Sequence, residues 1–243
     1  MSRLLFLTLL LTGCASKSEL DASNARIKAL EDKIASLEKA GPAVKQAAPA
    51  ADPAVEEAAG KLMQAIQDAL KANDSAGAKA KLAELQGDAY KGTRAQKAAE
   101  RMAAEVNIIG SDAPPITAEK WYQGKGEYSD SKATLLVFWE VWCPHCKKEI
   151  PKLAEEEGKY KDKGVQIVAM TKVTKSATDD KVQEFLKENK VKFPVGKEQD
   201  GSMSQAFAVT GIPAAALVKN GKVIWRGHPA RLDDATLDAL LKG

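Results

Sequence analysis

One stretch decides the fold of this chain: Trp142-Cys143-Pro144-His145-Cys146-Lys147-Lys148-Glu149. It directly follows the run at residues 134–139, which is short, continuously apolar and rich in residues that suit a pleated core. The composition after the cysteines is typical of a helix. The sequence therefore predicts a buried strand that passes into a helix, with two cysteines at the junction.

The spacing of the cysteines predicts a dithiol that can open and close. If Cys143 lies at or just before the first helical turn, unpaired backbone N–H groups and the positive end of the helix dipole face its sulfur and favour the thiolate. Cys146 follows three residues later. That spacing puts both side chains on one helix face, within reach of a disulfide.

Three other uses of the pair compete with a redox role. A zinc site needs two more ligands, and the remaining candidates are Cys14, His145 inside the motif and His228. Covalent haem attachment requires a histidine directly after the second cysteine, where this chain has Lys147. A purely structural disulfide would close a two-residue loop and stabilise the fold only weakly. The residues therefore favour a redox role.

The stretch resembles the thioredoxin superfamily and, within it, the TlpA/ResA-like periplasmic thioredoxins. Residues 138–151 match the pattern of apolar strand, Trp-Cys-x-x-Cys and Lys-Lys-Glu-x-Pro helix. Gly211-Ile212-Pro213 and the run at 214–218 resemble the cis-proline loop of the family and its next strand, and Phe193-Pro194-Val195 matches a further segment. The resemblance covers residues 107–243. It implies an α/β fold, a thioredoxin-like mixed sheet with helices on both faces.

The periodicity of the chain agrees with that fold. After the motif helix the expected elements are a strand at 165–170, helices at 179–189 and 202–208, strands at 214–218 and 223–225, and a helix at 233–241. Asn220-Gly221 between the last two strands is a strong hairpin signal. Alternating strands and helices followed by a hairpin fit a mixed sheet that is covered on both faces.

The resemblance also implies roles for individual residues. Cys143 would be the nucleophile, and Cys146 would resolve the mixed disulfide. Pro213, predicted cis, would lie against the pair and leave the backbone of Ile212 to hydrogen-bond a bound peptide. Trp142 would flank the sulfurs or, alternatively, fill the core. The disulfide between the two cysteines would be the redox group, with no further cofactor and no metal.

Two acidic residues lie near the motif. Glu149 follows Cys146 by three residues and His145 by four, so its carboxylate can share their helix face. The family has an acid at this place that is implicated in proton handling, and a solvated glutamate is the alternative. Glu140 departs from the family, which has a small residue there, and we assign it no role. Trp139 is assigned to the core.

The dipeptide Pro144-His145 is a second departure, because reductive members carry proline just before the second cysteine. Cys-Pro-His-Cys is the motif of the periplasmic dithiol oxidase, whose potential is about −120 mV against about −270 mV in thioredoxin, a gap of roughly 7 kcal/mol. We therefore predict a thiol-disulfide oxidoreductase that acts mainly as a reductant, with a potential above that of thioredoxin. A dithiol oxidase or isomerase is the alternative.

Two other function classes are alternatives to an oxidoreductase. A peroxiredoxin-like peroxidase would need proline at Leu136 and threonine at Glu140, and the chain has neither. A non-catalytic envelope tether is suggested by the first half of the chain.

The first residues predict export and a lipid anchor. Residues 1–3 and the apolar residues 4–11 form a signal peptide that is too short to span a bilayer permanently. Leu11-Thr12-Gly13-Cys14 resembles a bacterial lipobox, in which cleavage leaves Cys14 lipid-modified; an ordinary signal peptide with a chance cysteine is the alternative. The other two cysteines then form the only possible pair in an oxidising compartment. The protein is therefore expected in the periplasm, and Ala15, directly after Cys14, favours anchoring to the outer membrane over anchoring to the inner membrane.

Composition divides the chain into parts. Of thirteen aromatic residues, eleven lie between Trp121 and Trp225, so the main core is expected there. The predicted parts are a signal peptide at 1–13, a lipid-anchored tether at 14–19, a short coiled coil at 20–40, an Ala/Pro linker at 41–53, a helical spacer at 54–106 and the thioredoxin-like domain at 107–243. A formal charge of +3 is too small to indicate nucleic-acid binding.

The predicted coiled coil and spacer show helical periodicity, and no catalytic or metal-binding motif is recognised in them. Heptad positions in residues 20–40 are occupied by Leu20, Ile27 and Ile34 and by Ser23, Leu30 and Leu37. This pattern favours a two-stranded coiled coil and hence a homo-oligomer, with a solvated single helix as the alternative. Three helices are expected in the spacer: the first begins at Pro53 with Asp52 as its cap, the second begins near Ser75, and the third begins at Thr93, which is its cap. We interpret them as a spacer, with partner recognition as the alternative. The expected partners of the protein are disulfide-bearing clients and a membrane electron donor or acceptor.

Overall fold

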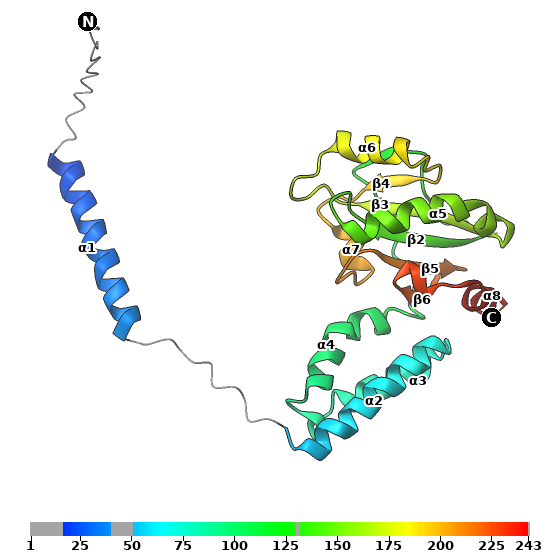
Figure 1. Ribbon diagram of the computed structural model, residues 1–243, viewed down its shortest axis with the longest axis horizontal. Helices are drawn as coiled ribbons and strands as arrows, with labels where there is room; N and C mark the ends of the chain where they lie inside the picture. The colour runs from blue at the N-terminus through cyan, green and yellow to red at the C-terminus, as the bar shows by residue number, and fades with distance from the viewer. Residues whose placement is uncertain (1–16, 40–50, 130–131, 243) are drawn as a thin grey trace, which may run out of the picture. The chain divides into compact units, whose positions relative to one another are not determined.

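The computed structural model describes residues 17–39, 51–129 and 132–242 (Figure 1). The predicted signal peptide, Cys14 and most of the predicted linker lie outside the described residues. The chain divides into two units, residues 1–48 and 49–243. No helix in the described ranges is both long and apolar enough to cross a bilayer.

The described residues of the first unit form α1 (Lys17–Lys39), a helix that begins three residues before the predicted coiled coil. Its apolar side chains Ile27, Leu30 and Ile34 are 51%, 60% and 54% exposed. The helix is present as expected, and its pairing into a coiled coil stays a prediction.

The second unit opens with three helices, α2 (Pro53–Lys71), α3 (Ser75–Leu85) and α4 (Arg94–Asn107). We call them the helical unit. Asp52, Asp74 and Thr93 cap them, each accepting a backbone N–H from the first turn. Two of these caps were foreseen, and Asp74 is one residue before the expected start. Small and branched side chains close the shared core: Ala59, Ala78, Ala99, Ile66, Leu82 and Leu85.

The rest of this unit is a six-stranded mixed sheet, which we call the sheet domain, with the order β1-β4-β3-β2-β5-β6. The strands are β1 (Lys120–Gln123), β2 (Ala133–Trp139), β3 (Val165–Thr171), β4 (Val195–Lys197), β5 (Ala214–Lys219) and β6 (Lys222–Gly227). β2 pairs with β3 in parallel and with β5 in antiparallel register, and all seven of its residues are buried. This continuous burial explains why the segment is apolar without alternation.

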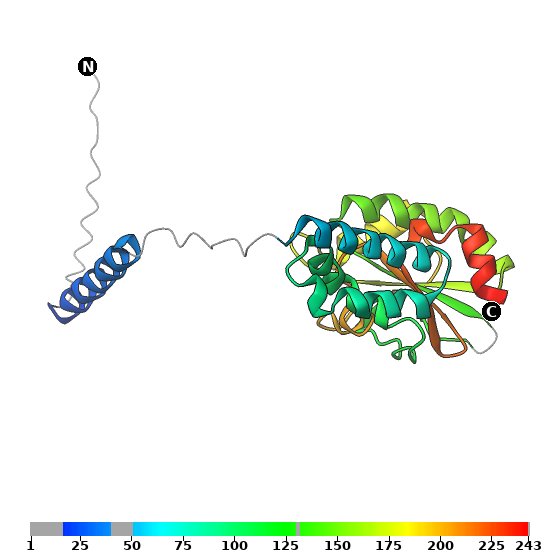
Figure 2. The same ribbon diagram turned by 90° about the horizontal axis from the view of Figure 1, so that it is seen from below.

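Helices cover both faces of the sheet, as predicted (Figure 2). Successive β2 side chains point to opposite faces. Leu135, Val137 and Trp139 pack with α5 (Pro144–Asp162), α6 (Asp179–Glu188) and α8 (Asp234–Lys242). Leu136 and Phe138 pack on the other face with α7 (Ser202–Ala206). The α/β fold with helices on both faces is confirmed.

Backbone bonds join the helical unit to the edge of the sheet. The segment that follows α4 pairs with β6: Gly110 N–H donates to the Val223 carbonyl (2.6 Å), and Val223 N–H donates to the Ser111 carbonyl (3.0 Å). This segment covers an edge that would otherwise expose unpaired backbone groups. Two strands, β1 and β4, were not among the expected elements, because they are only four and three residues long.

Candidate active site

The cysteine motif lies where β2 ends and α5 begins. Cys143 is the N-cap of α5, and its sulfur accepts the backbone N–H of Cys146 at 3.4 Å. Pro144 takes the first helical position, where the missing N–H costs no hydrogen bond. The start of the helix therefore directs an N–H group and the positive dipole end at the first sulfur, as the sequence predicts.

Both cysteines are free thiols buried at this junction. The Cys143 sulfur also lies 3.7 Å from the carbonyl oxygen of Ile212, to which the thiol donates. Burial raises the pKa of the Cys146 thiol well above its ordinary value, and the hydrogen bond with Cys143 acts in the same direction. Cys146 is therefore a thiol, not a thiolate, at neutral pH.

The loop before β5 supplies the second side of the site. The peptide bond between Ile212 and Pro213 is cis, as predicted, and Pro213 is buried. The register of the sheet puts the loop there, because Ala214 at the start of β5 pairs with Phe138 near the end of β2. Antiparallel pairing thus brings two segments about seventy residues apart to one edge of the sheet.

A buried carboxylate lies on the third side of the site. The carboxylate of Glu140, only 5% exposed, accepts the indole N–H of Trp142 at 2.6 Å and the hydroxyl of Thr174. The ammonium of Lys175 lies 3.1 Å above the centroid of the Trp142 ring, a cation–π contact. This position of Glu140 was not predicted from the sequence, although a charged residue where the family has a small one was the available signal. Trp139, by contrast, lies in the core as predicted.

His145 and Glu149 lie on the first turns of α5 with different exposure. His145 is exposed, whereas Glu149 is buried next to a cavity of about 200 Å³ that Tyr160 also lines. Burial raises the pKa of Tyr160 to about 12, and the charges of Glu156 and Glu149 add to the effect. Burial lowers the pKa of His228, which the Glu149 charge opposes.

In the described part of the chain, no three or more His, Cys, Asp or Glu side chains are grouped so that they could hold a metal ion. The site thus brings together two sulfurs, a cis-proline loop and two buried carboxylates. Thiol–disulfide exchange needs only the sulfurs and a route for protons.

Comparisons with known proteins agree with this chemistry. A model described as the AhpC/TSA family matches residues 109–226. Thiol-disulfide oxidoreductase ResA of Bacillus thuringiensis subsp. konkukian is 37% identical over 119 residues, which cover 48% of this chain and 67% of the relative. ResA of Bacillus subtilis is 36% identical over 118 residues, covering 47% and 64%.

Solved structures are also similar. The putative thiol:disulfide interchange protein DsbE from Chlorobium tepidum is 26% identical with a TM-score of 0.46, over 55% of this chain and 97% of that one. The curated relatives and the resemblance of residues 138–151 agree on both family and chemistry. The chain therefore belongs to the ResA-like thiol-disulfide oxidoreductases of the thioredoxin superfamily.

Proposed function

We propose that the chain is a lipid-anchored oxidoreductase of the cell envelope that reduces protein disulfides through Cys143 and Cys146. One observation carries the proposal. The Cys143 sulfur lies at the start of α5, accepts the Cys146 N–H and is 3.7 Å from the Ile212 carbonyl that precedes the cis-proline. The helix start directs a backbone N–H group and its positive dipole end at this sulfur, and the loop offers a backbone segment that a client peptide can approach.

The reaction proceeds in two exchange steps. The Cys143 thiolate attacks one sulfur of the client disulfide, which breaks the client bond and forms a mixed disulfide; the departing client sulfur takes a proton. Cys146 then loses its proton and attacks the Cys143 sulfur. The Cys143–Cys146 disulfide forms, and the second client thiol leaves. The client gains two electrons and two protons, which a dithiol electron donor later restores to this protein.

The second step needs a proton acceptor, because burial raises the pKa of the attacking Cys146. Glu149 follows Cys146 by one helical turn on α5, and its side chain is buried. We assign it the role of receiving this proton. Glu149→Gln should slow disulfide closure more than mixed-disulfide formation, which stopped-flow measurements of the two phases can separate.

A trapping experiment tests the function itself. Reduced Cys146→Ser protein should hold a disulfide-bearing client such as insulin as a mixed disulfide on Cys143, and the wild type should release reduced insulin. A Cys143→Ser variant that still reduces insulin would refute the proposal and would favour a non-catalytic tether.

The direction of electron flow depends on the dipeptide Pro144-His145, which is exposed at the first turn of α5. Equilibration with glutathione gives the potential. A value between those of thioredoxin and the dithiol oxidase, about −270 and −120 mV, is expected, nearer the former for a reductant. A value near −120 mV would favour a dithiol oxidase or isomerase. Peroxide turnover is not expected, because Leu136 and Glu140 replace the peroxidase residues.

The anchor and the compartment are inferred from the first residues, which lie outside the described ranges. Cys14→Ala should prevent lipid attachment and release the protein into the periplasmic fraction, while the unaltered chain fractionates with membranes. The outer membrane is favoured by Ala15. Labelling with radioactive palmitate that is equal in both proteins would contradict the anchor.

A further inference from the structure

We propose that α4 of the helical unit forms one wall of the client-binding groove, and that this groove takes an extended apolar segment next to the client's reacting cysteine. The inference rests on the proposed function, since it concerns the same cis-proline loop. It gives the helical unit a task beyond spacing.

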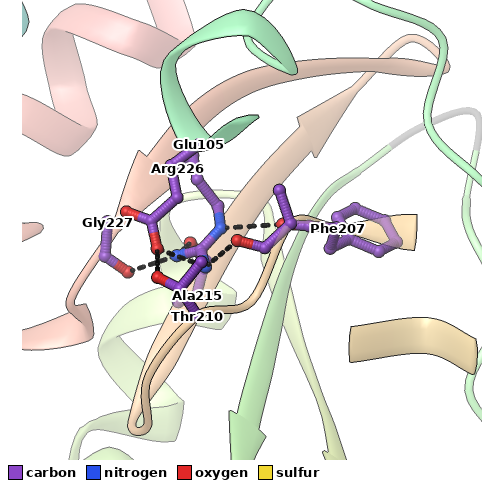
Figure 3. A network of polar contacts seen from close by, with 7 residues as sticks. Glu105, Phe207, Thr210, Ala215, Arg226 and Gly227 are labelled. Atoms are coloured by element: carbon purple, nitrogen blue, oxygen red, sulfur yellow. Dashed lines mark hydrogen bonds and ion pairs between the residues drawn. The ribbon is translucent and has the colours of Figure 1, made fainter. Parts of the chain in front are cut away.

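A polar network holds α4 against the cis-proline loop (Figure 3). The Arg226 side chain, on β6, is 1% exposed, and its Nη2 lies 3.3 Å from the Glu105 carboxylate on α4. The same carboxylate oxygen accepts the hydroxyl of Thr210 at 2.8 Å. Thr210 precedes the cis-proline by three residues, so one carboxylate joins the helical unit to both β6 and the loop.

The network leaves no free charge on Arg226. The guanidinium also donates to four backbone carbonyls, at 3.0 to 3.4 Å: those of Phe207, Ala208, Ala215 and Gly227. All the N–H groups of this buried guanidinium are therefore used within the protein. Arg226 connects elements of the fold and has little capacity left to bind an anionic ligand. Recognition in the adjoining space must therefore come from its other lining residues.

That space is a groove between α4 and the loop. A cavity of about 350 Å³ is lined by Met102 and Val106 of α4, by Ile109, and by Ile212 and Pro213 of the loop. It shares Leu70, Met102 and Ile109 with a cavity of about 750 Å³ that continues along β6. These volumes are in the range of ligand sites, and the shared lining combines the apolar side chains of Leu70, Met102 and Ile109 with Gly227, Arg226 and Arg231.

The groove shares one residue, Ile212, with the surroundings of the reacting sulfur. Ile212, which lines it, has its carbonyl oxygen 3.7 Å from the Cys143 sulfur. A mixed disulfide holds the client sulfur about 2 Å from that atom, and an extended chain advances about 3.3 Å per residue. Client residues two to four places from the cysteine thus reach the groove. A side chain built on Gly211 would meet nothing within 4 Å, so the loop is open on the way.

Photo-crosslinking tests the wall directly. The probe is a ten-residue peptide with one cysteine flanked by leucines, and the cysteine is activated as a mixed disulfide with thionitrobenzoate. Benzoylphenylalanine is placed two or four residues from the cysteine, on its N-terminal or its C-terminal side. Reduced full-length Cys146→Ser protein should release thionitrobenzoate and, on irradiation, form adducts at Met102 or its α4 neighbours. Adducts confined to residues 114–243 would overturn the wall while leaving the proposed function intact. No thionitrobenzoate release would overturn both.

A selectivity measurement gives an independent result. In otherwise native protein, Met102→Glu should lower the ratio of kcat/KM for the peptide disulfide to that for a small aromatic disulfide by about tenfold, because it puts a charge on an apolar wall. Ala104→Glu, on the exposed face of the same helix, should leave the ratio unchanged. Met102 also contacts the helical core, so Met102→Gln serves as the milder variant, with circular dichroism as the check on folding. An unchanged ratio in a folded variant would contradict the proposal.

Discussion

The helical unit and the sheet domain close their cores with different side chains. The sheet domain fully buries large rings, those of Phe138, Trp139, Phe193 and Phe207. The helical unit buries four alanines at its helix contacts together with Ile66, Leu82, Leu85 and Val106. Small side chains allow helices to approach closely, but they remove less apolar surface from water per residue. The sheet domain, which carries the active site, therefore gains more stability from its own core. The helical unit gains less from its core and depends more on the contacts of Glu105 with Arg226 of β6 and with Thr210, which we call the joint.

The largest effect should come from the site, which belongs to the sheet domain. Cys143→Ser should abolish insulin reduction. The thiol that remains in the described residues is Cys146, and its raised pKa keeps it protonated, so it cannot begin the exchange. The melting of the helical unit should not change. Residual turnover above that of a double cysteine variant would contradict the assignment of the nucleophile.

The next largest effect concerns the aromatic core. Phe138→Ala should lower the free energy of unfolding by about 3–5 kcal/mol, because the ring is completely buried against Phe207, with ring centroids 5.5 Å apart. Guanidinium titration followed by tryptophan fluorescence measures it. Phe138→Leu, which retains most of the volume, is the control and should cost clearly less.

The joint between the two regions should contribute less. Glu105→Gln keeps an acceptor for Thr210 but removes the negative charge beside Arg226. We expect a loss of about 1–2 kcal/mol, the range by which a hydrogen bond with a charged group exceeds a neutral one. Glu100→Gln on the exposed side of α4 is the matched control. Equal losses in the two variants would mean that the joint adds nothing.

The pH dependence of the sheet domain should be of similar or smaller size. Folding raises the pKa of Cys146, so the folded reduced protein holds this proton more tightly than the unfolded chain does. The free energy of unfolding should therefore fall as pH rises above the unfolded value of about 8.5, by about 1 kcal/mol at pH 9.5. Cys146→Ala should remove this part of the fall. A parallel pH profile in that variant would refute it.

The smallest effect is expected in α1, whose apolar side chains are exposed. Leu30→Asn should change the stability of the sheet domain by less than about 0.5 kcal/mol. Sedimentation velocity on the same variant tests the predicted coiled coil, because a polar side chain at this heptad position should weaken association. An unchanged sedimentation coefficient would leave α1 a single helix.

Features encoded within a few neighbouring residues could be predicted from the sequence. The hairpin between β5 and β6 follows from Asn220-Gly221, which adopt φ of 50° and 71°, as a two-residue turn of this kind needs. The helix caps at Asp52 and Thr93 depend on bonds that span only two or three residues. The cis-proline was predicted through the family resemblance, since nothing local distinguishes it from a trans one.

Contacts between distant residues could not be predicted. Glu140 meets Thr174 across 34 positions, and Arg226 meets Glu105 across 121. Neither the buried Glu140 carboxylate nor the buried Arg226 guanidinium carries a local pattern that indicates burial, and each has partners from other elements of the fold. The short strand β1 likewise depends on β4, to which it pairs, more than on its own composition.

The sequence by itself determined the chemistry: two cysteines at a strand-to-helix junction, whose first sulfur faces the N–H groups of the helix it begins. Only the tertiary structure decided what else belongs to the site, namely the Ile212 carbonyl beside that sulfur and the buried Glu140 carboxylate bound to Trp142 and Thr174. The reason is physical. A helix start acts over one turn, whereas burial of a charge and closure of a groove require elements that the chain brings together only by folding.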